Sequence, residues 1–359
     1  MAIEPIIKKL NAQIRRSSDK VERCELLLQL VKHLNETNNP EIKKQGKVLL
    51  DLAHEVKSNT HLAWCYYHLG DFDKKHGNFD QAKEEINKCM LLFKEQKDIY
   101  GLASAHNGMG NILDSQDKYD LSIKHYKASI RYGTKLGNKS GFAICLNNIG
   151  LVQTKKGEYR AALDSLNKAL PIFEDMQFKP GIIAVRDNIG VIHAKLGNYP
   201  KALSYYLSSL KLSEEIGNVR GIANSYTCIG DLYYTQREYD LSMQNYTNCL
   251  KVRRQTRDIR GIAESHNNIG LVYQQRNNFL KARYNLLLSV KYARETNYLY
   301  CLSSAYINLG GLYFQKSDFK LSLEYYHLAL NASTLIGQQK RLILIYFDLL
   351  INALIFNIL

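Results

Sequence analysis

The 359-residue sequence is poor in residues that break or cross-link a chain. Five prolines and the lack of any tract rich in serine and glycine argue against long disordered linkers. The seven cysteines form no Cys-x-x-Cys pair and are odd in number, so we expect neither a disulfide framework nor a zinc site. We interpret them as small buried hydrophobic residues in a reducing compartment.

The sequence also lacks signals for export and for catalysis. Its first twenty residues contain no long apolar region of the kind found in a secretory signal peptide, which predicts a cytoplasmic protein. We find no phosphate-binding loop, metalloprotease motif or serine-hydrolase elbow. His106 and His266 share a helix position that should face a partner helix, so we interpret them as core residues. We therefore predict no enzyme activity, no cofactor and no metal.

Positive charge is in excess, with a formal net charge of +14. Such a surface attracts nucleic acid, anionic membrane or acidic protein partners without choosing among them. The basic run Lys251–Arg260 is most simply a solvated cluster at a helix end, and a site for an acidic or phosphate-bearing partner is the sharper alternative. Because no helix-turn-helix segment precedes the repeats described next, nucleic acid is not the expected partner.

The most abundant signal is an internal repeat of forty residues. An aromatic residue stands nine positions after each glycine of the main series, and small residues stand twelve and nineteen positions after it. A second glycine series, from Gly101 to Gly261, keeps the same step. The main series comprises Gly70, Gly110, Gly150, Gly190, Gly230, Gly270 and Gly310.

Each repeat reads as two helices, here called A and B. In the fourth repeat, Gly181–Gly197 is apolar at three- and four-residue spacing and predicts helix A, and Asn198–Gly217 predicts helix B. The glycine and the small residues should let the two helices approach closely, and the aromatic at position nine should fill the wedge beside them. One pair cannot bury its apolar faces alone, so the pairs must stack.

This pattern, as in Ile189–Leu210, resembles the tetratricopeptide repeat, with repeats of forty residues in place of thirty-four. Repeats of this length are similar to those of spindle-orientation adaptor proteins and kinesin light chains, and to the sensor regions of bacterial kinases and nucleotide cyclases. The resemblance implies an all-α superhelical solenoid of antiparallel helix pairs, with the A helices lining a concave groove. It covers residues 60–336 as seven repeats.

The two ends of the chain are less regular. Residues 1–59 contain two amphipathic segments, 21–36 and 40–56, which we interpret as a degenerate repeat that caps the array. Residues 337–359 are apolar almost all round, and a capping helix is the leading interpretation. The start of a membrane span and a truncated end that lacks a downstream domain are the alternatives.

Five positions of helix A should face away from helix B: six and three before the glycine, and one, four and five after it. Their residue types change from repeat to repeat, whereas the packing positions stay constant, as expected if a particular ligand selects them. The predicted binding residues are Asn107, Asn111, Ile144, Asn147, Leu151, Lys155, Asp187, Val191, Lys195, Thr227, Asp231, Tyr234, Asn267 and Leu271.

The chemistry of these positions suits a peptide. The side-chain amides of Asn107, Asn147 and Asn267 could pair with a peptide backbone, and lysines at the rim could meet carboxylates. The alternative is that these polar residues are merely solvated. The second asparagine of the recurring motif, as in Asn148, Asn188, Asn268 and Asn308, should bond between helices and not to a ligand. The Lys/Asn set with which chaperone-binding repeats clamp two carboxylates is not present.

Two functions follow from the sequence. The leading hypothesis is a protein–protein interaction scaffold that binds a peptide or protein, with an acidic partner as one reading. The alternative is the sensor part of a bacterial signalling protein whose kinase or cyclase domain lies outside this chain. The sequence indicates no particular oligomeric state.

Overall fold

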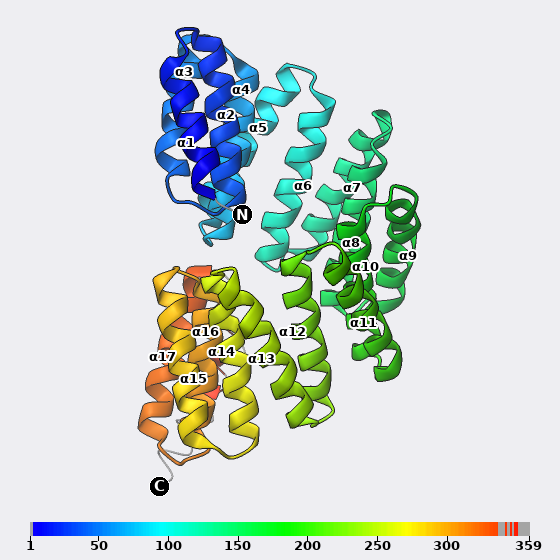
Figure 1. The fold of residues 1–359 in the computed structure, drawn as a ribbon, viewed down its shortest axis with the longest axis vertical. Coiled ribbons are helices and arrows are strands. Elements are labelled where there is room, and N and C mark those ends of the chain that lie inside the picture. The colour runs from blue at the N-terminus through cyan, green and yellow to red at the C-terminus, as the bar shows by residue number, and fades with distance from the viewer. Residues whose placement is uncertain (1–2, 337–341, 343–344, 347, 351–359) are drawn as a thin grey trace. The chain divides into compact units, whose positions relative to one another are not determined.

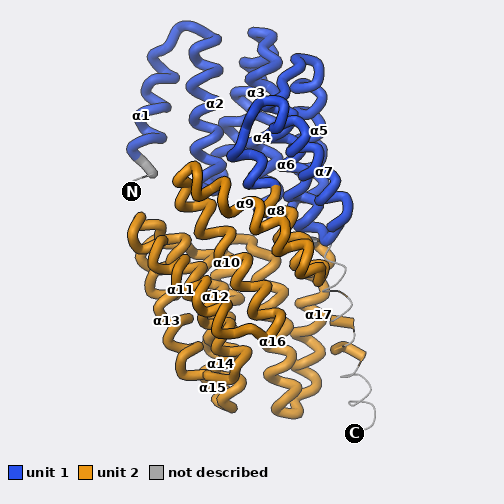
Figure 2. The backbone as a smooth tube through the Cα atoms, turned by 90° about the vertical axis from the view of Figure 1, so that its right-hand side faces the viewer, with its two compact units in different colours: residues 1–145 blue, residues 146–359 orange. Residues whose placement is uncertain are grey.

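The protein is described by a computed structural model that covers residues 3–336, 342, 345–346 and 348–350. These residues form seventeen α-helices and the turns between them (Figure 1). The chain divides into two compact units, residues 1–145 and 146–359, and the boundary falls inside helix α8 (Figure 2). The predicted all-α class of antiparallel helix pairs is confirmed.

Unit 1 contains the less regular N-terminal helices and the first two pairs of the forty-residue array. Its helices are α1 (Ile3–Arg16), α2 (Lys20–Glu36), α3 (Ile42–Glu55), α4 (Asn59–Lys75), α5 (Phe79–Glu95), α6 (Ile99–Ser115), α7 (Tyr119–Lys135) and the first part of α8 (Lys139–Lys156).

Unit 2 continues the same alternation of A and B helices from the second part of α8. Its helices are α9 (Tyr159–Asp175), α10 (Lys179–Lys195), α11 (Tyr199–Glu215), α12 (Val219–Thr235), α13 (Tyr239–Gln255), α14 (Ile259–Gln275), α15 (Phe279–Glu295), α16 (Leu299–Phe314) and α17 (Phe319–Ile336).

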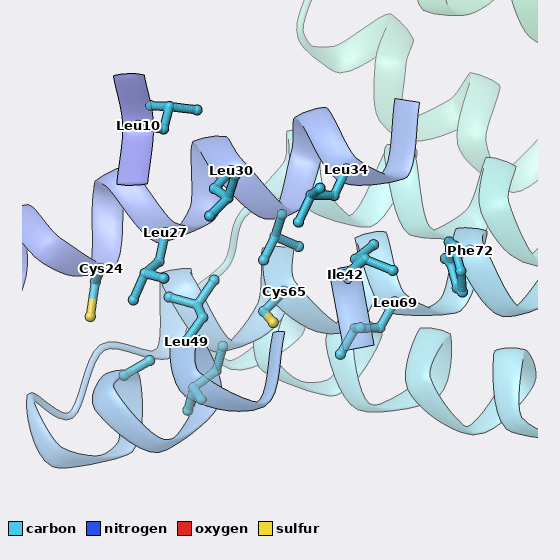
Figure 3. Close-up of a cluster of buried hydrophobic side chains, with 13 residues drawn as sticks. Leu10, Cys24, Leu27, Leu30, Leu34, Ile42, Leu49, Cys65, Leu69 and Phe72 are labelled. Carbon is cyan, nitrogen blue, oxygen red and sulfur yellow. The ribbon is translucent and has the colours of Figure 1, made fainter. Parts of the chain in front are cut away.

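The first sixteen residues hold a helix that the sequence reading did not anticipate. We predicted two helices in residues 1–59, and α2 and α3 match them, but α1 is a third. It adds Leu10 to a buried cluster that extends along α2 and α3 to Cys65 and Phe72 of α4 (Figure 3). An amphipathic helix is stabilised mainly by such tertiary packing, and a 14-residue helix alone would be marginal in water.

Side-chain caps explain the second glycine series. The carboxylate of Asp98 accepts a hydrogen bond from the backbone N–H of Gly101 at 2.9 Å, and Asp258 does the same for Gly261 at 3.0 Å. A methyl group on Gly101 would lie 2.3 Å from the ring of Phe93, so the cap and helix B approach too closely for a side chain there.

The main glycine series marks the crossing of helices A and B, and an aromatic residue other than the one at position nine lies directly over it. A methyl group on Gly190 would lie 2.5 Å from the ring of Tyr206, and one on Gly110 would lie 2.5 Å from the ring of Tyr126. These tyrosines stand sixteen residues after the glycine, not nine. Position nine is the first residue of helix B, as Tyr199 is in α11, and it packs beside the crossing with Ala202 and Tyr206.

Both histidines pack against a B helix and most cysteines are buried, as predicted. His266 is 3% exposed, and its Nδ1 lies 2.9 Å from Oδ1 of Asn285 on α15. His106 faces His125 of α7, with 3.1 Å between their Nδ1 atoms. All seven cysteines are free, and six of them are buried.

Most of the predicted C-terminal helix, residues 337–359, lies outside the described residues. Within the part that is described, Ile345 is fully buried in the cluster around Tyr326, and Leu349 packs against that cluster. Among the described helices, none combines the length and the apolar character needed to cross a membrane.

Candidate functional site

The predicted binding residues lie on helices α6, α8, α10, α12 and α14, on the side that we call the A-face. The A-face consists of the five positions of each A helix defined above. Ile144, Lys155, Lys195 and Asp231 are exposed, Asn267 is buried, and the others are half-buried. Most of these positions are therefore open in part to a ligand, and Asn267, at 8% exposed, is the least accessible.

In unit 1 the A-face contains a hollow of about 490 Å³, within the size range of small-ligand sites. Residues of α4, α6, α7 and α8 line it, and two of them, Asn107 and Ile144, were predicted from the sequence. No side chain in the lining is charged. Residues that the sequence reading missed are Tyr67, Tyr100, Ser104, Leu136 and Ser140.

A chain of hydrogen bonds holds one wall of this hollow. The thiol of Cys145 donates to the hydroxyl of Ser129 at 3.3 Å and also points at Oδ1 of Asn107, at 3.7 Å. Ser129 in turn donates to the backbone carbonyl of Ala103 at 2.7 Å. Because these contacts orient the oxygen of Asn107, the polar part of the hollow is preorganised.

Exposed apolar side chains stand beside that polar wall. Tyr100 is 54% exposed, Leu136 is 46% exposed and Ile144 is 37% exposed. They come from α6, from the residue that ends α7, and from α8. The sequence signal for this apolar rim was Leu136, an apolar residue at a turn position where polar residues are usual. A hollow with one amide, several hydroxyls and an apolar rim can take a peptide main chain and one apolar side chain.

In unit 2 the asparagines of the recurring motif bond to one another between repeats. The side-chain amide of Asn188 on α10 donates to Oδ1 of Asn147 on α8 at 2.8 Å. The same bond joins Asn308 on α16 to Asn267 on α14 at 2.9 Å. The predicted bond between helices is thus confirmed for Asn188 and Asn308. The first asparagine uses its oxygen for this bond, which leaves its amide group for the peptide contact that we predicted.

Two carboxylates lie on the A-face of unit 2. Oδ1 of Asp187 is hidden from solvent and has no hydrogen-bond partner, and burial raises the pKa of Asp187 to about 7. Asp231 accepts a hydrogen bond from the hydroxyl of Tyr246 at 2.5 Å. An edge of Asp231 reaches solvent, yet the protein around its carboxyl raises its pKa to about 6. Charged forms of both side chains are therefore disfavoured unless a cation is near.

The remaining predicted residues have ordinary surroundings. Thr227 donates to the backbone carbonyl of Ala223 at 2.9 Å, and Tyr234 packs edge-on against Tyr239. Asn111 accepts from the hydroxyl of Tyr126 at 2.7 Å. Within the described part of the chain, no group of three or more His, Cys, Asp or Glu side chains is placed to hold a metal ion. Half-buried apolar residues at the position after the glycine are Leu151, Val191 and Leu271.

This repeating pairing of helices, with a variable A-face, defines an all-α repeat protein of the solenoid class. Two family models, both described as tetratricopeptide repeat, match the chain, one at residues 101–175 and 181–255 and the other at residues 63–95. The matched stretches cover just over half of the sequence. The chain belongs to the tetratricopeptide repeat family.

Individual relatives are distant. The Tonsoku-like protein of Mus musculus is 25% identical over 138 residues, which are 38% of this chain and 10% of that protein. The chain thus spans about a tenth of the length of this curated relative.

Two solved structures show the same fold. A Rap protein complexed with competence and sporulation factor aligns with 93% of this chain and 98% of its own, with a TM-score of 0.71 and 13% identity. NprR in complex with its cognate peptide NprX aligns with 94% of this chain and 98% of its own, with a TM-score of 0.57 and 19% identity. At these identities the likeness extends to the fold alone.

Proposed function

We propose that this protein is an interaction scaffold that binds a peptide, or an extended segment of a protein, along its A-face. The observation that carries the proposal is the uncharged hollow of unit 1, which opens where Asn107 and Ile144 were predicted to meet a ligand. Support also comes from the fold, since NprR, of the same fold, was solved with a bound peptide. The proposal includes two further points: the protein catalyses no reaction, and it acts in the cytoplasm.

The partner's chemistry follows from the lining. A peptide main chain would pair with the amide of Asn107 and with nearby hydroxyls, and an apolar side chain would cover Ile144 and Leu136. Within unit 2, an acidic ligand group would meet the exposed side chains of Lys155 and Lys195. We also propose that residues 60–336 form the binding array and that residues 1–59 and 337–359 cover its ends.

A matched pair of variants tests the proposal. Peptides would be selected from a displayed random library against the whole chain, and their dissociation constants measured by fluorescence polarisation. Ile144→Arg places a charge at the hollow and should weaken binding about tenfold or more, because it leaves a charge against an apolar contact. Leu121→Arg makes the same change at a residue of α7 that is 50% exposed and does not line the hollow.

The control should bind like the unaltered chain. Equal loss in both variants, or no loss in either, would place the ligand elsewhere and refute this site. Failure of any peptide to be enriched would count against the function itself.

The second candidate function is the sensor part of a signalling protein. It is favoured by the likeness in fold to NprR with its cognate peptide, over 94% of this chain. Sequencing the transcript beyond residue 359 distinguishes the two functions. A kinase or cyclase domain in frame would support the sensor, and a stop codon with no catalytic domain in any frame would exclude it.

A further inference from the structure

Around Asp187, two hydrogen bonds that recur elsewhere in the array are both absent. The first is the bond between asparagines of neighbouring repeats. Asn188 and Asn308 each donate to the residue three before the preceding repeat's glycine. For Asp187 the donor's position, forty-one residues on, is occupied by Cys228. Oδ1 of Asp187 is accordingly without a partner although it is hidden from solvent.

The second missing bond belongs to Tyr206. The hydroxyl of Tyr246 donates to Asp231, the residue directly after the glycine of its repeat, and Tyr126 does the same in unit 1. In the repeat of Tyr206 that position is Val191, which has no acceptor. Tyr206 is 2% exposed, and among the described residues its hydroxyl makes no hydrogen bond. Its oxygen is not fully hidden from solvent, so a ligand can reach the hydroxyl at the edge of this otherwise buried side chain.

Tyr206 and Cys228 lie near the same two carboxylates, those of Asp187 and Asp231. The charges of Asp187 and Asp231 both contribute to raising the pKa of Tyr206, after burial and Cys228. They also raise the pKa of Cys228, which burial raises most. Geometry agrees: Asp187 and Val191 lie one turn apart on α10, and Cys228 and Asp231 lie one turn apart on α12. Tyr206 of α11 packs in one cluster with Val191 and Cys228.

The protein's own cations near Asp231 are Arg253 and Lys195, which lower its pKa without outweighing the effect of burial. Arg253 lowers the pKa of Asp231, but its guanidinium is already engaged. It donates to the carbonyl of Gly261 at 2.7 Å and pairs with Glu264 at 3.0 Å. Lys195 lies at the exposed end of α10. The chain has a net charge of +14, so two neighbouring carboxylates on its ligand-facing side differ in sign from the chain as a whole. An unpaired hydroxyl lies beside them.

We propose that Asp187, Asp231 and Tyr206 form a site for the guanidinium group of an arginine side chain in a bound peptide. The inference rests on the proposed function and names one residue of the ligand. A planar guanidinium carries five N–H donors and can reach two carboxylates on neighbouring helices, whereas an ammonium is a compact point charge. One N–H would also meet the unpaired oxygen of the Tyr206 hydroxyl. The arginine supplies the hydrogen-bond donor that Asp187 lacks in this repeat.

The test uses the whole chain and a defined probe. The probe is an acetylated, amidated pentapeptide of alanine with arginine at its centre, and its partner carries citrulline, which has the same shape without the charge. Titrations followed by NMR should show saturable shifts at Asp187 and Asp231. The arginine peptide should bind at least about tenfold more tightly, because charge-assisted hydrogen bonds are the stronger ones.

Variants locate the binding. Asp187→Asn introduces the residue that Asn147 and Asn267 provide in other repeats, so folding is expected to survive, and affinity should fall about tenfold. Val191→Asn offers Tyr206 the acceptor that Asn111 gives to Tyr126, and it should also weaken binding. Asp164→Asn removes an exposed charge from α9 and should leave affinity unchanged.

Three results would overturn the inference: equal binding of the arginine and citrulline peptides, equal loss with Asp164→Asn and Asp187→Asn, or equally tight binding of a lysine peptide. The Ile144→Arg test in unit 1 separates the two proposals. Library peptides that need Ile144, together with no preference for arginine at Asp187, would refute only this inference. Loss of both would refute the proposed function as well.

Discussion

The side-chain amide of Asn188 donates a hydrogen bond to Oδ1 of Asn147 at 2.8 Å, across the interface between two successive A helices. The bond is part of the scaffold, since Asn308 and Asn267 repeat it at 2.9 Å in the same unit. The asparagines of the repeated motif therefore serve to hold neighbouring repeats together.

Asn188→Ala should destabilise unit 2 by about 1 kcal/mol, because it leaves the oxygen of Asn147 half-buried and unpaired. The loss should be visible as a lower urea midpoint and as faster amide exchange in α10. Asn224→Ala, at an exposed position of α12, is the control and should change neither. Equal effects of the two variants would show that the asparagine bond contributes nothing to stacking.

Two glycines of α6 should respond oppositely to the same substitution. A methyl group on Gly110 would lie 2.5 Å from the ring of Tyr126, so Gly110→Ala should cost about 1–3 kcal/mol through overpacking. On Gly108 the nearest atoms would lie at 3.4 Å, an ordinary contact. Gly108→Ala should be neutral or stabilise the helix by up to about 1 kcal/mol. Thermal unfolding followed by circular dichroism measures both, and a reversed order would contradict the proposed helix crossing.

Acid should destabilise unit 1 through His106. Burial, then the neighbouring His125 and Arg131, lowers the pKa of His106 from 6.5 to about 4. Between these two values the unfolded chain binds a proton that the folded chain does not, so stability falls as the pH drops from 6.5 towards 4. His106→Gln should reduce this dependence in urea titrations and leave the share of His68, whose pKa burial also lowers to about 4. Substitution of the exposed His327 should leave it intact. A dependence that persists unchanged in His106→Gln would assign it to other groups.

Base should act on a buried carboxyl of the same unit. Glu85 is 6% exposed, lies beside Asp73 and has Lys43 3.6 Å away. Burial, and then a hydrogen bond to Asp73, raises the pKa of Glu85 above its usual range. The folded chain then holds a proton that the unfolded chain has lost, so stability falls as the pH rises through that window.

Glu85→Gln should therefore gain stability relative to the unaltered chain at pH 8 and show little gain at pH 5. The comparison variant is Glu84→Gln, whose glutamate is exposed on the same helix. It should show no such difference between the two pH values in urea unfolding. A gain of the same size at both pH values would mean that Glu85 is charged throughout.

Much of the architecture was predictable because the signals are local and are repeated. The forty-residue spacing predicted helices at Gly181–Gly197 and Asn198–Gly217, and the structure places α10 and α11 within two residues of those bounds. Helix α1 escaped prediction because it belongs to no repeat, although Ile3, Ile7, Leu10 and Ile14 stand at helical spacing. Packing against α2 fixes its place in the fold.

The candidate site was only partly predictable. A helical wheel assigns Asn107 and Ile144 to the A-face, because the direction of a side chain on a helix follows from its position alone. Leu136 and Tyr100 could not be assigned in this way, since they reach the hollow from a helix end and from the first turn of α6.

The amino-acid sequence alone specified the repeat, the helix pairs and the side of each A helix that varies, since each depends on periodicity within one segment. Tertiary structure decided how neighbouring helices meet: Tyr206, not Tyr199, lies over Gly190, and the oxygen of Asn147 is occupied by Asn188. It also showed that Oδ1 of Asp187 and the hydroxyl of Tyr206 both lack a hydrogen-bond partner among the described residues. Hydrogen-bond satisfaction depends on distances between segments some twenty to forty residues apart, and no pattern within a segment encodes those distances.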